Sequence, residues 1–415
     1  MFTRFRQLYL NREVLGPFAA IYGVGFAPLL ILPFLFTAII GYFSISEAQA
    51  GVLVSVELGS MCLGSLLIAS IIDRFPKKYI AVLGTALAVI GNLLFISSTS
   101  LVTSYAYLVV AGLGYGIALA AGNSSVAALG GRSAEVFNRV VLLGTFMMII
   151  LLNVFPRIIV SWSLPGALIG LVILHCLLIP LLLAIPTSIP TKTAQAHEES
   201  KYKILFKPLS MAIILMVFFY FIRDTMVWVF AENIANTRLG MEPENIGLLF
   251  SIHGATSLLG PLILLWLMRR FGQDKLLLLG IVITGMISIV VSQTQSVLVF
   301  SSMVIIWSTA HFFTYSCIMG FAAAADSKGV VAAVAGAAVM GGTAVAPAIA
   351  GYAMDSGGSS LFTTGVMTVI LATFAFSYLS VYFKRKSKYI SKPLNVMTQT
   401  SRHKQLQTSE VSLDL

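Results

Sequence analysis

Long apolar runs separated by short polar segments make up most of this chain. Runs of about 17 to 25 apolar residues match the length that a helix needs to cross the hydrocarbon core of a bilayer. The pattern predicts twelve such helices, near residues 17–42, 49–72, 80–98, 104–128, 140–159, 166–186, 209–234, 245–268, 276–292, 297–323, 330–353 and 361–383.

The largest internal polar stretch runs from Thr187 to Pro208 and divides the pattern into six helices plus six. We therefore expect an all-α polytopic membrane protein with twelve transmembrane helices in two six-helix halves. The expected parts are an N-terminal half at 1–186, a cytoplasmic linker at 187–208, a C-terminal half at 209–383 and a disordered cytoplasmic tail at 384–415.

Composition supports a membrane environment. Apolar residues make up 58% of the 415 residues and charged residues only 10%, with a mean hydropathy of +0.94. A soluble chain carries roughly a quarter of its residues charged. As a soluble protein this chain would leave extensive apolar surface exposed to water, so lipid is the expected solvent for most of it.

The net charge of +10 is distributed in alternate loops. With the amino terminus placed in the cytoplasm, one side collects Arg4, Arg6, Arg12, Arg74, Lys77, Lys78, Arg132, Arg139, Lys192, Lys201, Lys203, Lys207, Arg269, Arg270, Lys275, Lys328 and the group from Lys384 to Lys404. Only Arg157, Arg223 and Arg238 lie elsewhere. This is the positive-inside pattern, and it predicts a multi-pass inner (plasma) membrane protein with both termini cytoplasmic and no nucleic-acid partner.

An internal repeat links the two halves. Gly64, Arg74 and Phe75 recur at the same spacing as Gly260, Arg270 and Phe271, each set ending a helix at a basic loop. Two homologous six-helix halves related by an axis along the membrane normal are a known plan for transporters.

The first of these loops, Asp73-Arg74-Phe75-Pro76-Lys77-Lys78, resembles the Gly-x-x-x-Asp-Arg-x-Gly-Arg-Arg loop of the major facilitator superfamily, with Ala69 and Pro76 in place of the two glycines. The second loop keeps Gly272 and has Arg269 where the aspartate is expected. The resemblance implies a conformational latch, in which an acidic group faces a helix amino terminus of the other half. That start would lie near Gly329 and Val330, and the latch residues would be Asp73, Arg74, Lys77, Arg269 and Arg270.

Other family patterns are only partly present. Gly112, Gly114 and Gly116 resemble the Arg-x-x-x-Gly-x-Gly pattern of the fourth helix, but Leu108 stands in the arginine position. The Gly-Pro motif of drug antiporters is absent from the fifth helix. A proton role ascribed to that arginine therefore does not carry over to this chain.

Ionisable residues inside the apolar runs are few, and such groups normally face a cavity or a partner. Glu57 is a lone carboxylate in the second helix, and Asp224 lies about midway along the seventh. Both are candidates for proton coupling, because a carboxylate in apolar surroundings can load and release a proton. The alternative for Glu57 is a neutral, hydrogen-bonded acid that holds two helices together.

Arg223 precedes Asp224, so the two side chains point about 100° apart on a helix. A cavity-facing Arg223 would favour an anionic substrate through bidentate binding, and Glu57 is one possible partner; a structural ion pair inside one half is the alternative. Tyr220 and Trp228 share a helix face with Asp224, which suits a cavity lining or plain helix packing.

Further polar and aromatic residues complete the candidate substrate site. His311 shares a helix face with Trp307 and Tyr315, and Asn123 is expected on the face of Tyr115 in the fourth helix. Glu232, Asn233 and Asn236 lie near the outer rim, where gating or solvation is expected.

Small residues mark the eleventh helix. Gly341 and Gly342 allow close helix approach, and Pro347 frees a backbone carbonyl and permits bending. These three residues are candidates for gating, and small-residue packing alone would also explain them.

Together these patterns predict a secondary active transporter of a small organic anion or zwitterionic metabolite, proton-coupled and working by alternating access as a monomer. Within this class, a proton-driven exporter of amphipathic compounds is the alternative. A membrane-embedded enzyme is disfavoured because no nucleophile–base pair or metal-ligand spacing is present, and nucleotide-driven pumping because no phosphate loop is present. A channel is disfavoured because it would not require the two-half repeat and no pore-lining ring is recognisable. We expect no cofactor and no metal.

Overall fold

The computed structural model describes residues 11–69, 71–98, 100–186, 203–325 and 330–410, with side chains up to residue 386 except those of Asp73 and Ala134. Within these residues the regular elements are all helical. Their bounds in the first half are α2 (Arg12–Phe18), η1 (Ala19–Gly25), α3 (Ala27–Leu30), α4 (Leu32–Phe43), α5 (Glu47–Ala69), η2 (Ile72–Arg74), α6 (Lys77–Ile96), α7 (Leu101–Ala127), η3 (Gly130–Arg132) and α8 (Ser133–Leu183).

The second half has a matching set of helices. Their bounds are η4 (Lys203–Phe206), α10 (Pro208–Asn233), η5 (Ile234–Arg238), α11 (Pro243–Thr256), α12 (Leu259–Phe271), α13 (Gln273–Gln293), α14 (Val297–Ala323) and α15 (Val330–Glu410). Elements α2 to α4 form one span, broken where Pro28 and Pro33 remove backbone donors. Elements α11 and α12 likewise form one span. Each of the long helices α8 and α15 contains two spans. The twelve-helix fold is thereby confirmed.

The two long helices break at corresponding places. Ser163 interrupts α8 with φ 55° and ψ −158°, and Gly358 interrupts α15 with φ 60° and ψ −157°. This backbone region is almost restricted to glycine. Each break separates the fifth and sixth spans of its half, so the same reversal closes both halves of the repeat.

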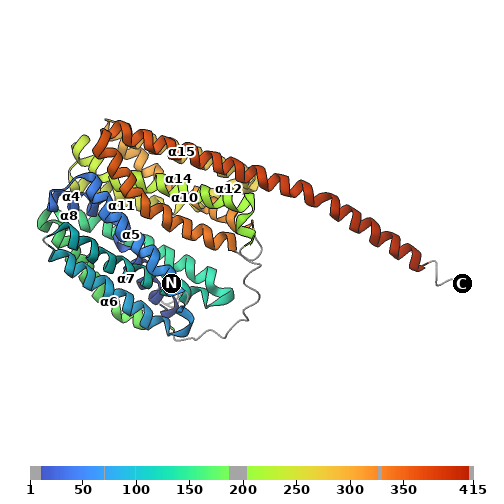
Figure 1. The fold of residues 1–415 in the computed structure, drawn as a ribbon, viewed down its shortest axis with the longest axis horizontal. Coiled ribbons are helices and arrows are strands. Elements are labelled where there is room, and N and C mark those ends of the chain that lie inside the picture. The colour runs from blue at the N-terminus through green and yellow to red at the C-terminus, as the bar shows by residue number, and fades with distance from the viewer. Residues whose placement is uncertain (1–10, 70, 99, 187–202, 326–329, 411–415) are drawn as a thin grey trace, which may run out of the picture.

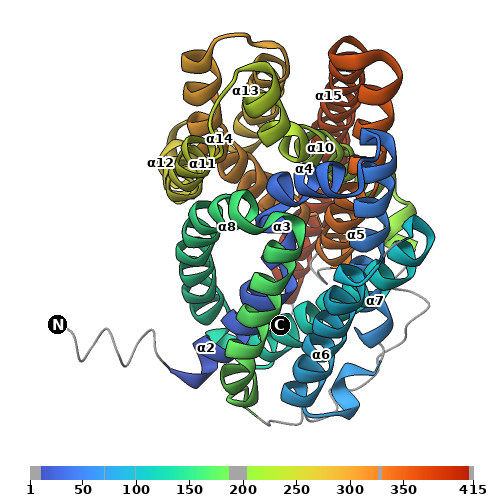
Figure 2. The same ribbon diagram turned by 90° about the vertical axis from the view of Figure 1, so that its left-hand side faces the viewer.

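The two halves form two groups of helices that meet along α4, α5, α10 and α15 (Figure 2). We call the end of the bundle that holds Phe43, Ser163, Arg238 and Gly358 the distal end. The opposite end, where α2 begins and α8 leads toward residues 187–202, is the linker end (Figure 1).

Contacts between the halves lie toward the distal end. The Ala348 amide of α15 donates to the Ser55 hydroxyl of α5 at 2.9 Å, and the Ser251 hydroxyl of α11 donates to the Ile149 carbonyl of α8 at 3.0 Å. Phe36 of α4 packs against Phe230 of α10 with ring centroids 4.8 Å apart. The two halves are therefore closed against each other at this end.

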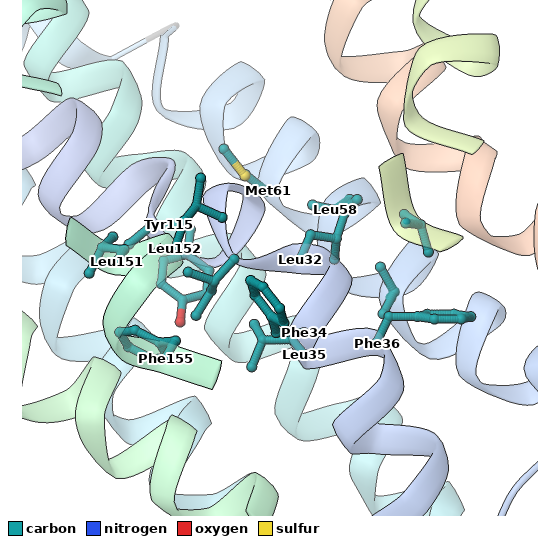
Figure 3. Close-up of a cluster of buried hydrophobic side chains, with 14 of the residues drawn as sticks. Leu32, Phe34, Leu35, Phe36, Leu58, Met61, Tyr115, Leu151, Leu152 and Phe155 are labelled. Atoms are coloured by element: carbon teal, nitrogen blue, oxygen red, sulfur yellow. The ribbon is translucent and has the colours of Figure 1, made fainter. Parts of the chain in front are cut away.

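The buried apolar side chains form two clusters. The larger contains residues of both halves, and Figure 3 shows part of it, where side chains of α4, α5, α7 and α8 meet. The smaller cluster lies toward the linker end and contains only residues of the second half, such as Met216, Leu277 and Phe321. A shared core at one end and a separate core at the other suit two bodies that rock about the centre.

The boundaries of linker and tail stay predictions. Residues 187–202 lie outside the described residues, and α15 continues as a helix to Glu410, away from the helix bundle (Figure 1). The disorder expected of the tail from residue 384 onward likewise stays a prediction.

Candidate functional site

Asp224 is the centre of a polar cluster between α10 and α14. Its Oδ1 lies 3.0 Å from His311 Nδ1 and accepts a hydrogen bond from Trp307 Nε1 at 3.0 Å. The Asp224 and His311 side chains are 16% and 14% exposed. A carboxylate inside a membrane-spanning helix is thus held by two ring donors of a neighbouring helix while one edge stays accessible.

Tyr220 closes one side of this cluster. It is fully buried, and its hydroxyl lies 3.3 Å from His311 Nδ1 and 3.4 Å from the His311 carbonyl oxygen. Tyr315 stacks on the His311 ring, with an interplanar angle of 17°. Asp224, a candidate for proton coupling, therefore lies together with three candidates for substrate binding, which are Tyr220, His311 and Tyr315.

Arg223 borders this cluster and donates its hydrogen bonds to α13. Its Nη1 donates to the Thr284 carbonyl at 2.7 Å and to the Ser288 hydroxyl at 2.9 Å, and its guanidinium lies over the Tyr220 ring at 4.5 Å. The side chain is 2% exposed, with Asp224 at 3.8 Å. This geometry favours the structural alternative and does not support the expected role as substrate counter-ion or as partner of Glu57.

Trp228 belongs to an adjoining aromatic group. It stacks on His253 of α11 with centroids 5.1 Å apart and meets Trp307 edge-on at 6.1 Å. His253 Nδ1 lies 2.7 Å from the Val304 carbonyl. Through Trp307 this group is continuous with the Asp224 cluster, so α10, α11 and α14 share one polar-aromatic face.

The first half carries a second, sparser polar group around Glu57 in α5. Glu57 is 7% exposed, and within the described residues its side chain has no hydrogen bond or ion pair. Nearby Tyr115 accepts a hydrogen bond from Asn92 Nδ2 at 2.6 Å and meets His175 edge-on. Glu57 therefore stands alone, without the helix-to-helix hydrogen bond of the structural alternative.

Tyr115 and Asn123 do not form a joint lining. Tyr115 is fully buried inside the first half, whereas Asn123 is exposed near the linker end of α7. The two side chains therefore have different surroundings, one in the core of the first half and the other at its surface. Their role in binding substrate stays a prediction.

The loop residues expected to form a latch are only partly visible. The Asp73 side chain and Gly329 lie outside the described residues, while Arg74, Arg269 and Arg270 are exposed. Lys77 is buried at 3% and has a contact partner. The latch thus stays a prediction.

Sequence reasoning missed an ion pair beside the second loop. Asp274 accepts from Lys384 Nζ at 2.7 Å, with Arg385 at 3.6 Å. Only the fold brings these residues together, since they lie far apart along the chain.

The expected gating residues lie at two close helix contacts. A Cβ on Gly342 would meet the Phe218 carbonyl of α10 at 2.5 Å, whereas Gly341 is looser. A Cβ on Gly51 of α5 would lie only 2.3 Å from the Pro347 carbonyl oxygen of α15. Pro347 therefore takes part in the contact between the halves, together with Ser55, a residue that the sequence pattern did not single out.

The comparisons with known proteins agree with this architecture. The family model of the Major Facilitator Superfamily matches residues 15–325 and 213–407. The chain belongs to the major facilitator superfamily. No curated protein matches it closely enough to add a nearer relative.

Solved structures of this superfamily share the fold at low sequence identity. The nucleoside transporter NupG is 14% identical over 90% of this chain and 98% of its own, with a TM-score of 0.66. A bacterial homologue of the human lysosomal transporter Spinster, in an inward-facing unoccupied conformation, is 16% identical over 89% and 95%, with a TM-score of 0.66. The human organic anion transporter MFSD10 is 13% identical over 90% and 99%, with a TM-score of 0.61. This member of the superfamily is thus a multi-pass membrane transporter rather than an enzyme, with a small molecule as its substrate.

Proposed function

We propose that this protein is a proton-coupled secondary active transporter of a small organic metabolite, working by alternating access in the inner membrane as a monomer with both termini cytoplasmic. The observation that carries the proposal is the Asp224 carboxylate, which is held by His311 and Trp307 and stays partly accessible. Carboxylates inside membrane-spanning helices mark ion and proton pathways in transporters.

A proton on Asp224 would change the contacts between helices. The negative carboxylate binds His311 and Trp307 through charge-assisted hydrogen bonds, which are roughly twice as strong as neutral ones. Protonation weakens them and loosens α10 from α14. Because α10 also packs on α4 of the other half, this local event can bias the relative position of the two halves.

The substrate class that suits the site is a zwitterionic metabolite. With Arg223 buried against α13, the groups left to a substrate are the Asp224 carboxylate and the His311 ring, one for each charge of a zwitterion. The aromatic faces of Trp228 and Tyr315 suit an accompanying ring. Nucleosides and organic anions, named for the structural neighbours, belong in the same screen.

An exporter of amphipathic compounds is the second candidate. It is favoured by the continuous group of Trp228, His253 and Trp307 and by the structural position of Arg223, which leaves aromatic surface as the main recognition element. Binding of lipophilic cations that does not depend on His311 would select this candidate.

The decisive experiment measures transport by the full chain in proteoliposomes with an imposed proton gradient. Amino acids, nucleosides, organic anions and lipophilic cations are screened, and the accumulated solute is then followed in variants. We expect Asp224→Asn to lose gradient-driven accumulation. Exchange of substrate across the membrane should persist only at higher substrate concentration, because the variant also lacks the carboxylate that binds the positive charge of the substrate. The control Glu242→Gln removes an exposed carboxylate and should behave like the unmodified protein.

Two outcomes would redirect the proposal. Undiminished accumulation in Asp224→Asn, with loss in Glu57→Gln, would assign coupling to Glu57. If accumulation did not depend on the imposed proton gradient in the unmodified protein or in any variant, proton coupling would be excluded.

A further inference from the structure

A cavity of about 280 Å³ lies between the halves at the distal end. Thr37 and Tyr42 of α4 and Ser163 at the break of α8 line it from the first half, and Glu232 and Asn236 line it from the second. Its volume is close to the lower limit of small-molecule pockets, roughly 300 Å³. The cavity is separate from the Asp224 cluster, with which it shares no residue.

Glu232 is the unusual member of this lining. It is only 5% exposed, the Thr37 hydroxyl interacts with its carboxylate, and its Oε2 is buried without a hydrogen-bond partner in the described part of the chain. A buried carboxylate oxygen without a partner is costly, and such groups in native proteins call for an explanation. One such explanation is a ligand that donates a hydrogen bond to this oxygen.

The nearby guanidinium groups do not satisfy this carboxylate. Arg157 donates to Asn153 at 2.5 Å, and Arg238 donates to the Ser292 carbonyl at 2.5 Å. Among the described residues Glu232 forms no ion pair. The cavity therefore holds a carboxyl group to which the described part of the protein supplies no cationic partner.

Aromatic side chains stand beside this group. Tyr42 is 43% exposed and meets Phe43 edge-on, so its ring remains accessible at the cavity. Phe34 also lines the cavity and is anchored against Phe250 of α11 at 5.4 Å. Aromatic faces combined with a carboxylate are the usual means of recognising organic ammonium groups.

We propose that this distal cavity is a binding site for a small organic ammonium compound, with Glu232 as its counter-ion and Tyr42 as its aromatic wall. The site is additional to the transport site and does not depend on proton coupling at Asp224. Because its walls come from both halves, a bound ligand would favour the conformation in which the distal end is closed.

Binding of benzylammonium to the purified full chain in detergent tests this site, with uncharged benzyl alcohol of similar shape as the comparison ligand. Calorimetry should show that benzylammonium binds at least about tenfold more tightly than benzyl alcohol, a difference of about 1.4 kcal/mol. Glu232→Gln should abolish this difference. Glu244→Gln, which removes an exposed carboxylate at the first turn of α11, should preserve it.

A second variant tests the cavity without touching the carboxylate. A Cβ on Gly41, which lines the cavity, meets nothing within 4 Å, so Gly41→Phe should fold normally and weaken benzylammonium binding about tenfold or more. The proposal would be overturned if both cavity variants bound benzylammonium as tightly as the unmodified protein, or if the unmodified protein did not bind it. It would also be overturned if Asp224→Asn, and not Glu232→Gln, lost the binding.

Discussion

Arg223 shows how far one residue can be understood from its place in the chain. Its depth in a helix predicts a partner, and the structure supplies four in the same half: the Asp224 carboxylate, the Thr284 carbonyl, the Ser288 hydroxyl and the Tyr220 ring. The sequence could not separate this arrangement from a cavity-facing guanidinium, because the choice depends on where α13 packs.

We predict that Arg223→Gln destabilises the protein by about 3 kcal/mol, because it removes the buried cation beside Asp224 together with its hydrogen bonds to the Thr284 carbonyl and the Ser288 hydroxyl. Unfolding by denaturant in detergent measures this change. Lys275→Gln, at an exposed position, should stay within about 0.5 kcal/mol of the unmodified protein. Unchanged stability together with lost binding of organic anions would restore the counter-ion role.

At the scale of helices, the contact of α5 with α15 closes the distal end. A Cβ on Gly51 would meet the Pro347 carbonyl at 2.3 Å, and one on Gly351 would meet the Glu47 carbonyl at 2.2 Å. Helices that touch backbone to backbone need small residues at the contact. The glycines of the eleventh span were recognisable in the sequence, but their partner positions in α5 were not.

We predict that Gly51→Leu pushes α5 away from α15 and shifts the protein toward a conformation open at the distal end. In a background with Cys62, Cys176 and Cys317 replaced by serine, a cysteine at Thr37 reports on the distal cavity. Its labelling by a membrane-impermeant thiol reagent should rise about tenfold, which corresponds to about 1.4 kcal/mol of conformational shift.

Gly59→Leu is the matched control for this helix. A Cβ at Gly59 meets nothing within 4 Å, so this variant adds the same side chain to α5 without a clash. If both variants label at the same rate, closure at the distal end does not depend on the α5–α15 contact.

At the scale of the whole molecule, the charge pattern and the fold together predict which end of the helix bundle faces the cytoplasm. The distal end holds Ser356 beside the break of α15, and the linker end holds Arg269 at the end of α12. Because basic residues gather at the linker end, we predict that this end faces the cytoplasm.

Substituted cysteines test the prediction in whole cells. In the same cysteine-free background, Ser356→Cys should react with an impermeant maleimide added outside, and Arg269→Cys should react only after the membrane is permeabilised. The reverse labelling pattern would place both termini outside and would contradict the positive-inside assignment.

The sequence by itself determined the solvent, the span count and the division into halves. These follow from apolar runs of bilayer length, from the basic loops and from the recurrence of Gly64, Arg74 and Phe75 in the second half, all of which are local or periodic features. It also singled out Asp224, Tyr220, His311 and Tyr315, because polar and aromatic residues at helical spacing must share a face.

Only the tertiary structure decided which faces meet. It paired Asp224 with His311 and Trp307, turned Arg223 toward α13, left Glu57 alone in the first half and enclosed Glu232 in a cavity between the halves. The physical reason is that helical spacing specifies the direction of a side chain about its own axis, whereas its partners depend on the rotation and packing of neighbouring helices.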